Sequence, residues 1–539
     1  MFQSVKKIFS IFQANITKIV LVYLGLSFFI GLWHGFPLLN IYADEMLYVG
    51  GALRAIEHHT IIPAFGDVPY GTITYFLNYI LSGVFLLALL PFFKFSLFNL
   101  KIFLIQSAWV MYLPLRFLSF LVSLVCLYFF YQLLKKTVND LKTRLFLLIL
   151  FFSNIITIVV LHSGKMWVLS TMLLFASFYF LYSAMVKNTE RPTREIFLSV
   201  LFAFLAFANF QINFFALINI PILLYYFRKN HWLIKRIALF AVIGLVIFAV
   251  VIGLNIANFK WLIYKILFQD PNHSLNNLTN SNNLSSVWNS FLSNISKIVF
   301  LFPLSILVLL IAVAKNKTKN KNLFVLSVIY FLAYFVLLPV VASWTADVDL
   351  YLRYLFPIGF FLVPMIASFD LKFKKVFYYI GAVAIFCQVL TLYYLAIPTT
   401  YNQAYNWIVA NFKYKDVLIY NEIVELQLPQ NKQSALAEEP QFCGSKCQNI
   451  IKYDLNKEIK MSAIDRQYQP NFSWPTDSNS YYLVTMHRYD KLFPPIKIFS
   501  NGLADGNFFS PESSLGNYFY LDYYKIKRLG ASVYIYKVD

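Results

Sequence analysis

Residues 42–79 read YADEMLYVGGALRAIEHHTIIPAFGDVPYGTITYFLNY and separate one long apolar run from about ten others. The stretch carries six acidic or imidazole side chains: Asp44, Glu45, Glu57, His58, His59 and Asp67. Charge near a bilayer is costly unless something uses it, so this loop is a functional-site candidate. The alternative is a loop in water, which carries acids freely.

The composition places the rest of the chain in a membrane. Hydrophobic residues make up 59% of the 539 residues, charged residues make up 13%, and the mean hydropathy is +0.62. No soluble fold of this length buries so much apolar surface, and the alternation of a β-barrel is absent. We therefore expect a polytopic α-helical membrane protein.

Eleven apolar runs are candidate spans, and positive charge follows every second run. The runs lie at about 16–37, 116–134, 145–161, 167–186, 196–210, 213–227, 237–256, 298–314, 323–342, 353–369 and 376–397. The cation clusters are Lys135, Lys136, Lys142 and Arg144; Lys187, Arg191 and Arg194; Arg228, Lys229, Lys235 and Arg236; Lys315, Lys317, Lys319 and Lys321; and Lys372, Lys374 and Lys375. Cations gather on cytoplasmic loops, so this pattern predicts the N-terminus inside and the C-terminus outside. It also places the loops 38–115, 257–297 and 343–352 outside.

The net charge of +20 does not indicate nucleic-acid binding. From residue 398 onward, 15 Lys and Arg stand against 14 Asp and Glu, which leaves 30 against 11 in the membrane half. The excess belongs to the loops between spans, where it sets topology. We expect no nucleic-acid partner.

The apolar run at 72–93 does not fit the alternation. A single crossing there would move every later cation cluster outside. Either the run lies along the outer leaflet as a juxtamembrane helix, or it pairs with 101–113 as a second crossing. We favour the first reading, because the partner is short and Pro114 breaks it.

The tail at 398–539 has the composition of a soluble domain. Short β-like runs at 416–420, 481–486 and 531–538, with an amphipathic helix at 401–412, predict a small outer α/β domain. Cys443 and Cys447 are read as a disulfide loop, with half of a zinc site as the alternative.

Cations and acids gather at the outer ends of the predicted spans. The cations include Arg116, His162, Lys165 and Arg353. This layer suits a substrate with a lipid tail and a phosphate head, because the tail dissolves in the bilayer and the head meets Arg or Lys. The plainer readings are a snorkelling Arg116, a turn at His162 and Lys165, and an Arg353 paired with a nearby Asp. The run Asn209 to Asn213 is read as satisfying an outer hairpin, with substrate contact as the alternative.

If the substrate is a polyprenyl-phosphate sugar, few protein groups are needed. The phosphate leaves once cations hold its charge, and the acceptor hydroxyl needs a base, which Asp44 or Glu45 could supply. One of these acids could also share a divalent metal with Asp67 or His58, so a metal is possible, and no cofactor is certain.

Four segments together resemble the GT-C glycosyltransferases of the protein O-mannosyltransferase and aminoarabinose-transferase type. They are ADEMLY at 43–48, VPYGTITYFLNYI at 68–80, RFLSFLVSLVCLYFFYQLLKK at 116–136 and RYLFPIGFFLVP at 353–364. The resemblance implies that Asp44 occupies the family's catalytic acidic position and that Arg116 and Arg353 bind the lipid phosphate or stabilise the site. It also favours the juxtamembrane reading of 72–93, and Tyr70 in that entry is a further substrate-binding candidate.

Two positions depart from the family's pattern. HSGKMWVLSTM has Lys165 but no acid after it, which puts a second carboxylate in doubt. The Asn209 to Asn213 run stands where many members have a Lys in the outer hairpin.

These observations predict a transmembrane catalytic domain at 1–397, with an acidic loop and juxtamembrane helices at 38–115, and an extracytoplasmic domain at 398–539. The expected function is an inverting glycosyltransferase of the cell membrane, most simply a bacterial plasma membrane. It would take a polyprenyl-phosphate sugar and a protein, lipid or glycan acceptor. The alternative is a lipid-linked-glycan transporter, a polymerase or ligase, or a non-catalytic envelope component.

Overall fold

A computed structural model describes most of the chain. The described residues are 2–38, 45–64, 68, 70–186, 192–264, 281–315, 317–345, 355–371, 375–423, 425–429, 460–465, 481–489, 494–503 and 526–538. They form two compact units. The first unit comprises Met1–Leu32, Leu47–Gly83 and Pro114–Leu392, and the second comprises Trp33–Met46, Val84–Leu113 and Tyr393–Asp539.

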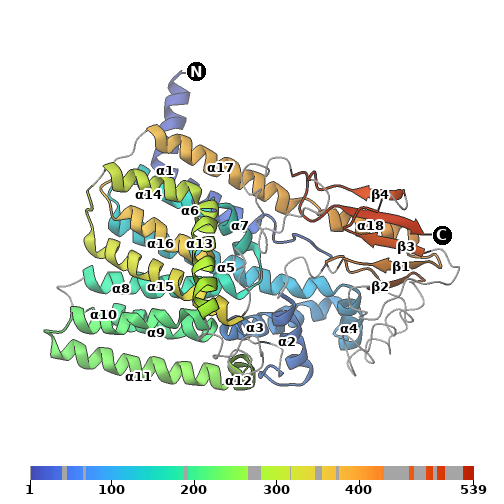
Figure 1. Ribbon diagram of the computed structural model, residues 1–539, viewed down its shortest axis with the longest axis horizontal. Helices are drawn as coiled ribbons and strands as arrows, with labels where there is room; N and C mark the ends of the chain where they lie inside the picture. Colours follow the sequence, from blue (N-terminus) through green and yellow to red (C-terminus); the bar gives the residue numbers. More distant parts are fainter. Residues whose placement is uncertain are drawn as a thin grey trace. The chain divides into compact units, whose positions relative to one another are not determined.

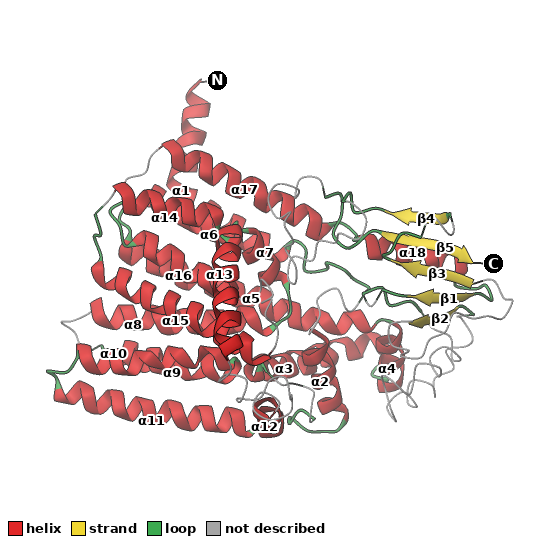
Figure 2. Ribbon diagram, in the orientation of Figure 1, coloured by secondary structure: helices red, strands yellow, loops and turns green. Residues whose placement is uncertain are grey.

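The first unit is helical (Figures 1 and 2). Its helices are α1 (Phe2–Phe29), α2 (Glu45–Glu57), α3 (Thr72–Leu89), α5 (Tyr112–Thr137), α6 (Leu141–Phe152), α7 (Ile155–His162), α8 (Met166–Val186), α9 (Thr193–Asn209), η3 (Gln211–Ile218), α10 (Asn219–Tyr226), α11 (His231–Gly253), α12 (Ile256–Tyr264), α13 (Ser281–Leu301), α14 (Pro303–Lys315), α15 (Lys321–Thr345), α16 (Phe356–Ala367) and α17 (Lys375–Ala396). The first two residues of α2, the start of α5, and the C-terminal ends of α3 and α17 extend into the second unit. Each of the eleven apolar runs overlaps one helix or a pair of helices in this order, although α1 ends at Phe29, before the end of the run at 16–37.

Length and composition mark this chain as a membrane protein. Among the described residues, five helices are long and apolar enough to cross a membrane, or up to seven if each bent pair counts as one span. Four further apolar helices are shorter, and Phe356–Ala367 is one of them. The prediction of a helical membrane protein is thus confirmed at this level.

Two of the predicted runs are bent rather than straight. Helices α6 and α7 meet at 63°, where Asn154 Oδ1 accepts from Ile156 N at 3.0 Å and begins α7. Helices α13 and α14 meet at 93°, directly before Pro303. Backbone groups freed inside a membrane protein need partners from neighbouring helices. Asn154 supplies such a partner at the second bend, because its Nδ2 donates to the carbonyl oxygen of Leu301, the last residue of α13, at 2.7 Å.

A buried glutamine fastens three helices of this unit. Gln388 of α17 is fully buried, and its Oε1 accepts from Ser153 Oγ at 2.6 Å and from Tyr23 OH at 2.7 Å. Ser153 lies at the break between α6 and α7, and Tyr23 lies on α1. Hydrogen bonds of this kind act between membrane helices, where the hydrophobic effect contributes little to association.

The core of the first unit is aromatic. Phe130 of α5 stacks on Phe151 of α6 at 4.9 Å and on Phe175 of α8 at 5.1 Å between ring centroids. Phe360 of α16 meets Phe151 edge-on at 4.4 Å. Dispersion between closely packed rings holds four helices together here.

Gly359 of α16 lies where this core leaves no room for a side chain. A Cβ at Gly359 would lie 2.4 Å from Phe302 Cε1 and 3.1 Å from Phe151 Cε2, whereas a Cβ at Gly381 of α17 would lie 3.6 Å from Phe146. We expect Gly359→Ala to lower the free energy of unfolding by about 1–3 kcal/mol. Gly381→Ala is expected to leave it unchanged or raise it by up to about 1 kcal/mol, since alanine favours helix. Thermal unfolding in one detergent compares the two; equal midpoints would contradict the packing described.

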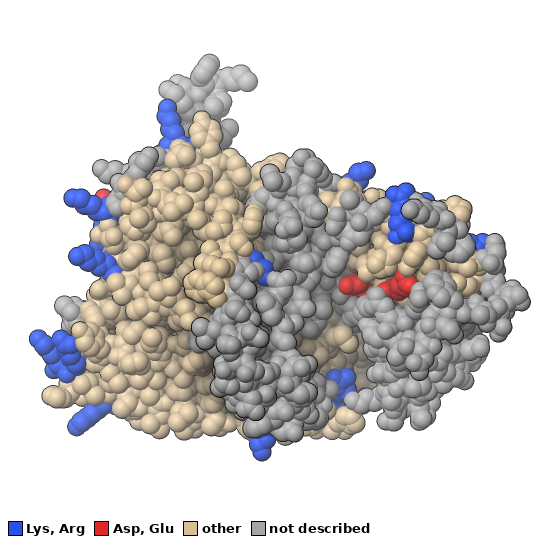
Figure 3. Space-filling view, in the orientation of Figure 1, with Lys and Arg blue, Asp and Glu red and all other residues tan. Residues whose placement is uncertain are grey.

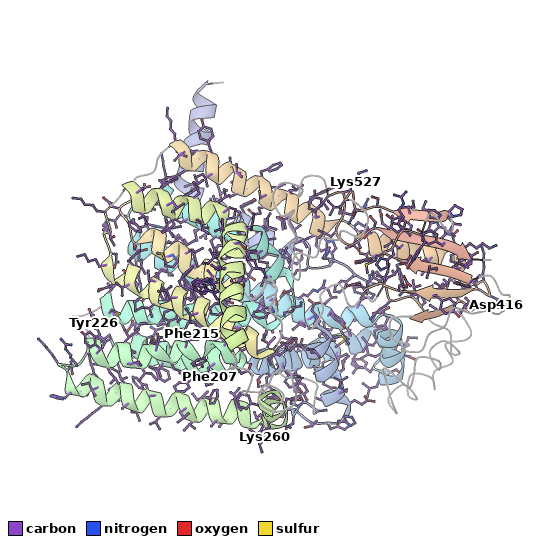
Figure 4. The ribbon with its side chains drawn as sticks, in the orientation of Figure 1. Phe207, Phe215, Tyr226, Lys260, Asp416 and Lys527 are labelled. Atoms are coloured by element: carbon purple, nitrogen blue, oxygen red, sulfur yellow. The ribbon has the colours of Figure 1, made fainter. Side chains whose placement is uncertain are left out.

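The helix ends that adjoin the basic loops lie together at one end of the first unit. At the last turn of α8, Ser183 Oγ accepts from Lys136 Nζ at 2.7 Å and Met185 O accepts from Tyr226 OH at 2.8 Å. Asn320, between α14 and α15, hydrogen-bonds Tyr182 OH of the same turn, and its N–H donates to Ser368 O, just after α16, at 2.9 Å. Figure 4 labels Tyr226 at this end, and Figure 3 shows blue Lys and Arg side chains along it. The basic loops identified in the sequence therefore adjoin the same end of the first unit.

The run at 72–93 forms α3 followed by η1 (Leu90–Phe93), and by length and composition it could cross a membrane. Its candidate partner at 101–113 is not one helix. It is divided among α4 (Leu97–Gln106), η2 (Ala108–Met111) and the start of α5. A ten-residue helix such as α4 covers about 15 Å, half of a bilayer core. The predicted outer loop at 257–297 likewise contains helix, in α12 and α13.

The second unit contains a five-stranded mixed sheet of order β2-β1-β3-β5-β4. Its strands are β1 (Leu418–Asn421), β2 (Ser462–Asp465), β3 (Tyr481–Thr485), β4 (Pro495–Phe499) and β5 (Val533–Val538). Strand β1 pairs in parallel with β2 and β3, while β5 pairs antiparallel with β3 and β4. The predicted strands at 416–420, 481–486 and 531–538 are confirmed as β1, β3 and β5; β2 and β4 were not predicted.

Helix α18 (Thr400–Phe412) covers this sheet and confirms the predicted amphipathic helix. Its buried face carries Tyr401, Ala404, Ile408 and Phe412, the spacing of one helical stripe. Asn402 in its first turn donates to Gly35 O at 2.8 Å and to Phe36 O at 3.0 Å, so the chain that follows α1 belongs to this unit. Cys443 and Cys447 lie outside the described residues.

Candidate functional site

Arg116 lies in the first turn of α5 and is 1% exposed. Its Nη1 donates to Leu32 O at 2.9 Å, just beyond the C-terminal end of α1. The last carbonyls of a helix have no partner within the helix and carry partial negative charge, so a guanidinium is stabilised there. Arg116 is thus an internal cation and not a side chain that snorkels to the interface.

His162, the last residue of α7, is fully buried beside Arg116. Its Nδ1 lies 2.6 Å from Ile158 O. A carbonyl oxygen only accepts, so Nδ1 donates to it and carries a proton. Within the described part of the chain Nε2 has no hydrogen-bond partner, and the charge of Arg116 and the carbonyls of Ser27 and Ile30 act on the ring. Arg116 and His162 therefore form one polar group at the end of α1.

Lys165 occupies the turn between α7 and α8 and is 2% exposed. Next to this turn, Trp167 at the start of α8 packs edge-on against Phe210, which follows α9, at 4.9 Å between ring centroids. Arg116 and Lys165 belong to the ends of α5 and α8 that are opposite the basic loops. In a straight helix, about 20 residues separate such ends by about 30 Å. Arg116 and His162 lie near such helix ends, and Lys165 lies in the turn directly before α8.

The remaining predicted site residues are described only in part. Glu45 is the first residue of α2 and is fully buried, and it belongs to the second unit. Tyr70 is half-buried directly before α3. Asp44, Asp67 and Arg353 lie outside the described residues.

The described residues contain no group of three or more His, Cys, Asp or Glu side chains that could hold a metal ion. His58 and His59, at the end of α2, are exposed. A metal site that used Asp44 and Asp67 would fall outside the described part of the chain.

Buried asparagines around the acidic stretch have a role that their sequence context does not indicate. Asn209 was assigned to a hairpin, but its Oδ1 accepts from Thr74 N at 3.0 Å at the start of α3. Asn213 does serve the turn after α9, where its N–H donates to Phe210 O and its Nδ2 donates to Ser170 Oγ at 2.7 Å. Asn255 and Asn258 also contact this stretch. No local pattern distinguishes these asparagines from others in a chain rich in them.

This arrangement supplies a fixed positive charge beside an imidazole ring, away from water. A buried guanidinium offers planar donors that match a phosphate, and its charge acts strongly where water is excluded. Comparison of the chain with protein-family models, curated proteins and solved structures finds no match. The function is therefore inferred from the residues of this chain alone, above all from Arg116, His162 and Lys165.

Proposed function

We propose that this chain is an inverting glycosyltransferase of the GT-C type that moves a sugar from a polyprenyl phosphate to an acceptor hydroxyl. The observation that supports the proposal best is the buried pair Arg116 and His162, with Lys165, at the end of the bundle opposite the basic loops. Two internal cations at one end of an apolar bundle suit a substrate that combines a phosphate with a lipid tail.

In the proposed reaction Asp44 removes the proton of the acceptor hydroxyl as its oxygen attacks the anomeric carbon. The bond between that carbon and the phosphate oxygen breaks, and polyprenyl phosphate leaves with the electron pair. Arg116, Lys165 and Arg353 would hold the phosphate charge, so no general acid is required. A single displacement inverts the anomeric configuration.

The proposed topology has eleven spans, with the basic end in the cytoplasm and the acidic stretch outside. The run at 72–93 would lie along the outer leaflet, which agrees with the division of its candidate partner into short helices. A bacterial plasma membrane is the proposed location, and the C-terminal sheet domain would stand outside.

The proposal is tested by incubating the purified chain with a panel of polyprenyl-phosphate sugars and an acceptor extract. We expect one donor to release polyprenyl phosphate, with transfer of an equal amount of sugar. Nucleotide sugars serve as the control and are expected to remain intact. Binding of polyprenyl phosphate without turnover of any donor would instead favour a transporter or a non-catalytic envelope component.

A further inference from the structure

Asparagine side chains from separate elements hold the chain that joins α2 to α3. Asn255, between α11 and α12, donates from Nδ2 to Val68 O at 3.0 Å and to Thr72 Oγ1 at 3.1 Å. Asn258, on α12, donates to Ala64 O at 3.1 Å and to Asn255 Oδ1 at 2.8 Å. Both asparagines are buried, and their partners lie almost 200 residues earlier in the sequence.

Asn209, the last residue of α9, holds the same connection from another element. Its backbone oxygen accepts from Gly71 N at 2.9 Å. Its Oδ1 accepts from Thr74 N at 3.0 Å and from Thr74 Oγ1 at 3.2 Å, which satisfies donors of the first turn of α3. Its Nδ2 has no partner among the described residues, so the side chain acts here only as an acceptor.

Helix α3 is in turn fastened to α2, the helix that begins at Glu45. Asn78 Nδ2 donates to Tyr48 O at 3.1 Å, and Tyr75 OH donates to Ile61 O at 3.2 Å. The side chains of Tyr48, Tyr75 and Asn78 are fully buried. The contacts therefore continue from α9 and α12, through the connection and α3, to the first turns of α2.

We propose that Asn209 and Asn255 are positioning residues that fix the connection between α2 and α3 and, through it, hold α2 in one place. The inference rests on the proposed function, in which Asp44 and Glu45 act directly before and at the start of α2. A buried amide in an apolar bundle is costly unless it is hydrogen-bonded, so these asparagines have a definite structural task. A general base has to lie within hydrogen-bond reach of the acceptor, which a loosely held helix does not ensure.

The two asparagines use different atoms, because Asn209 accepts hydrogen bonds through Oδ1 and Asn255 donates them through Nδ2. Substitution by aspartate is therefore expected to affect the two positions differently. Aspartate keeps the acceptor that Asn209 uses, and a carboxylate is as good as an amide at a helix N-terminus. At position 255 the same change removes the donor to Val68 O and Thr72 Oγ1. Asn209→Asp should therefore preserve the connection, whereas Asn209→Ala and Asn255→Asp should loosen it.

Amide hydrogen exchange of the full-length protein in nanodiscs measures this directly. We expect exchange in residues 60–76 to rise about tenfold in Asn209→Ala and Asn255→Asp, the effect of losing a buried hydrogen bond. Asn209→Asp should match the parent protein. Equal exchange in all four proteins, or equal loosening by both aspartates, would overturn the inference. A monodisperse elution profile for each variant excludes global misfolding.

Kinetics with the active donor add a readout that stability alone does not move. We expect kcat to fall about tenfold in Asn255→Asp and Asn209→Ala with KM for the donor unchanged, and Asn209→Asp to restore kcat. Faster exchange without any loss of kcat would overturn the positioning role. If no donor turns over in the parent protein, the proposed function fails, but the exchange contrast still decides whether these asparagines fix α2.

Discussion

Asp44→Asn is expected to reduce sugar transfer by about 1,000-fold, within the range for the loss of a general base. Asparagine has nearly the same shape as aspartate but does not take up the proton of the acceptor hydroxyl. The residue directly precedes α2, so the change removes one ionisable group and leaves the helix itself intact. The measurement is the initial rate of polyprenyl phosphate release at a saturating concentration of the active donor.

Glu57→Gln is the matched control for this prediction. Glu57 is the last residue of the same helix and is exposed, so neutralising it should leave the rate unchanged. Full activity of a well-expressed Asp44→Asn protein would show that Asp44 is not the base. Equal losses in both variants would indicate a general effect of charge near α2.

Gly71→Ala is expected to destabilise the first unit by about 2–5 kcal/mol, the combined cost of strain and overpacking. Gly71 has a φ of +74°, which alanine rarely adopts, and an added Cβ would lie 2.5 Å from Tyr48 OH and 2.7 Å from Tyr48 Cε1. The glycine cannot retreat easily, because its N–H donates to Asn209 O. The yield of monodisperse protein and the midpoint of thermal unfolding measure the effect.

Gly83→Ala supplies the comparison, since Gly83 lies within α3, the helix that Gly71 directly precedes, but a Cβ at Gly83 would meet nothing within 4 Å. We expect this variant to unfold at the same temperature as the parent protein or slightly above it, because alanine stabilises helix by up to about 1 kcal/mol. A Gly71→Ala protein as stable as Gly83→Ala would mean that Tyr48 does not pack against Gly71 as described.

The long apolar helices and three of the five strands were predictable because their signals are strong and local. Long apolar runs form helix in a membrane protein whatever their detailed sequence, and the basic loops show which helix ends share a face. The bends between α6 and α7 and between α13 and α14 were harder to predict. Ser153 and Asn154 are typical of a helix start, and so is Pro303. Each lies inside a long apolar run, however, and such a run by itself predicts one continuous helix. Helix α13 was missed because its Ser and Asn residues are typical of loops.

The contacts of the candidate site were less predictable, for a physical reason. The proximity of Arg116 to His162 depends on how α5 and α7 pack against the end of α1, and packing is not written in any one segment. The same holds for Asn255, whose partner Val68 is 187 positions away. The sequence singled out Arg116, His162 and Lys165 by residue type and by their place at helix ends. It carried no sign of which asparagines would be structural.

The buried Gln388 also has a consequence for how the chain assembles during synthesis. The hydroxyls of Tyr23 and Ser153 both donate to Gln388 Oε1. This acceptor lies 365 residues after Tyr23 and 235 residues after Ser153 in the sequence. Hydrocarbon offers neither hydroxyl an acceptor in the meantime. The hydrogen bonds of Tyr23 and Ser153 to Gln388 therefore form only after α17, the last helix of the bundle, has left the ribosome, while the residues of the sheet are still to be synthesised.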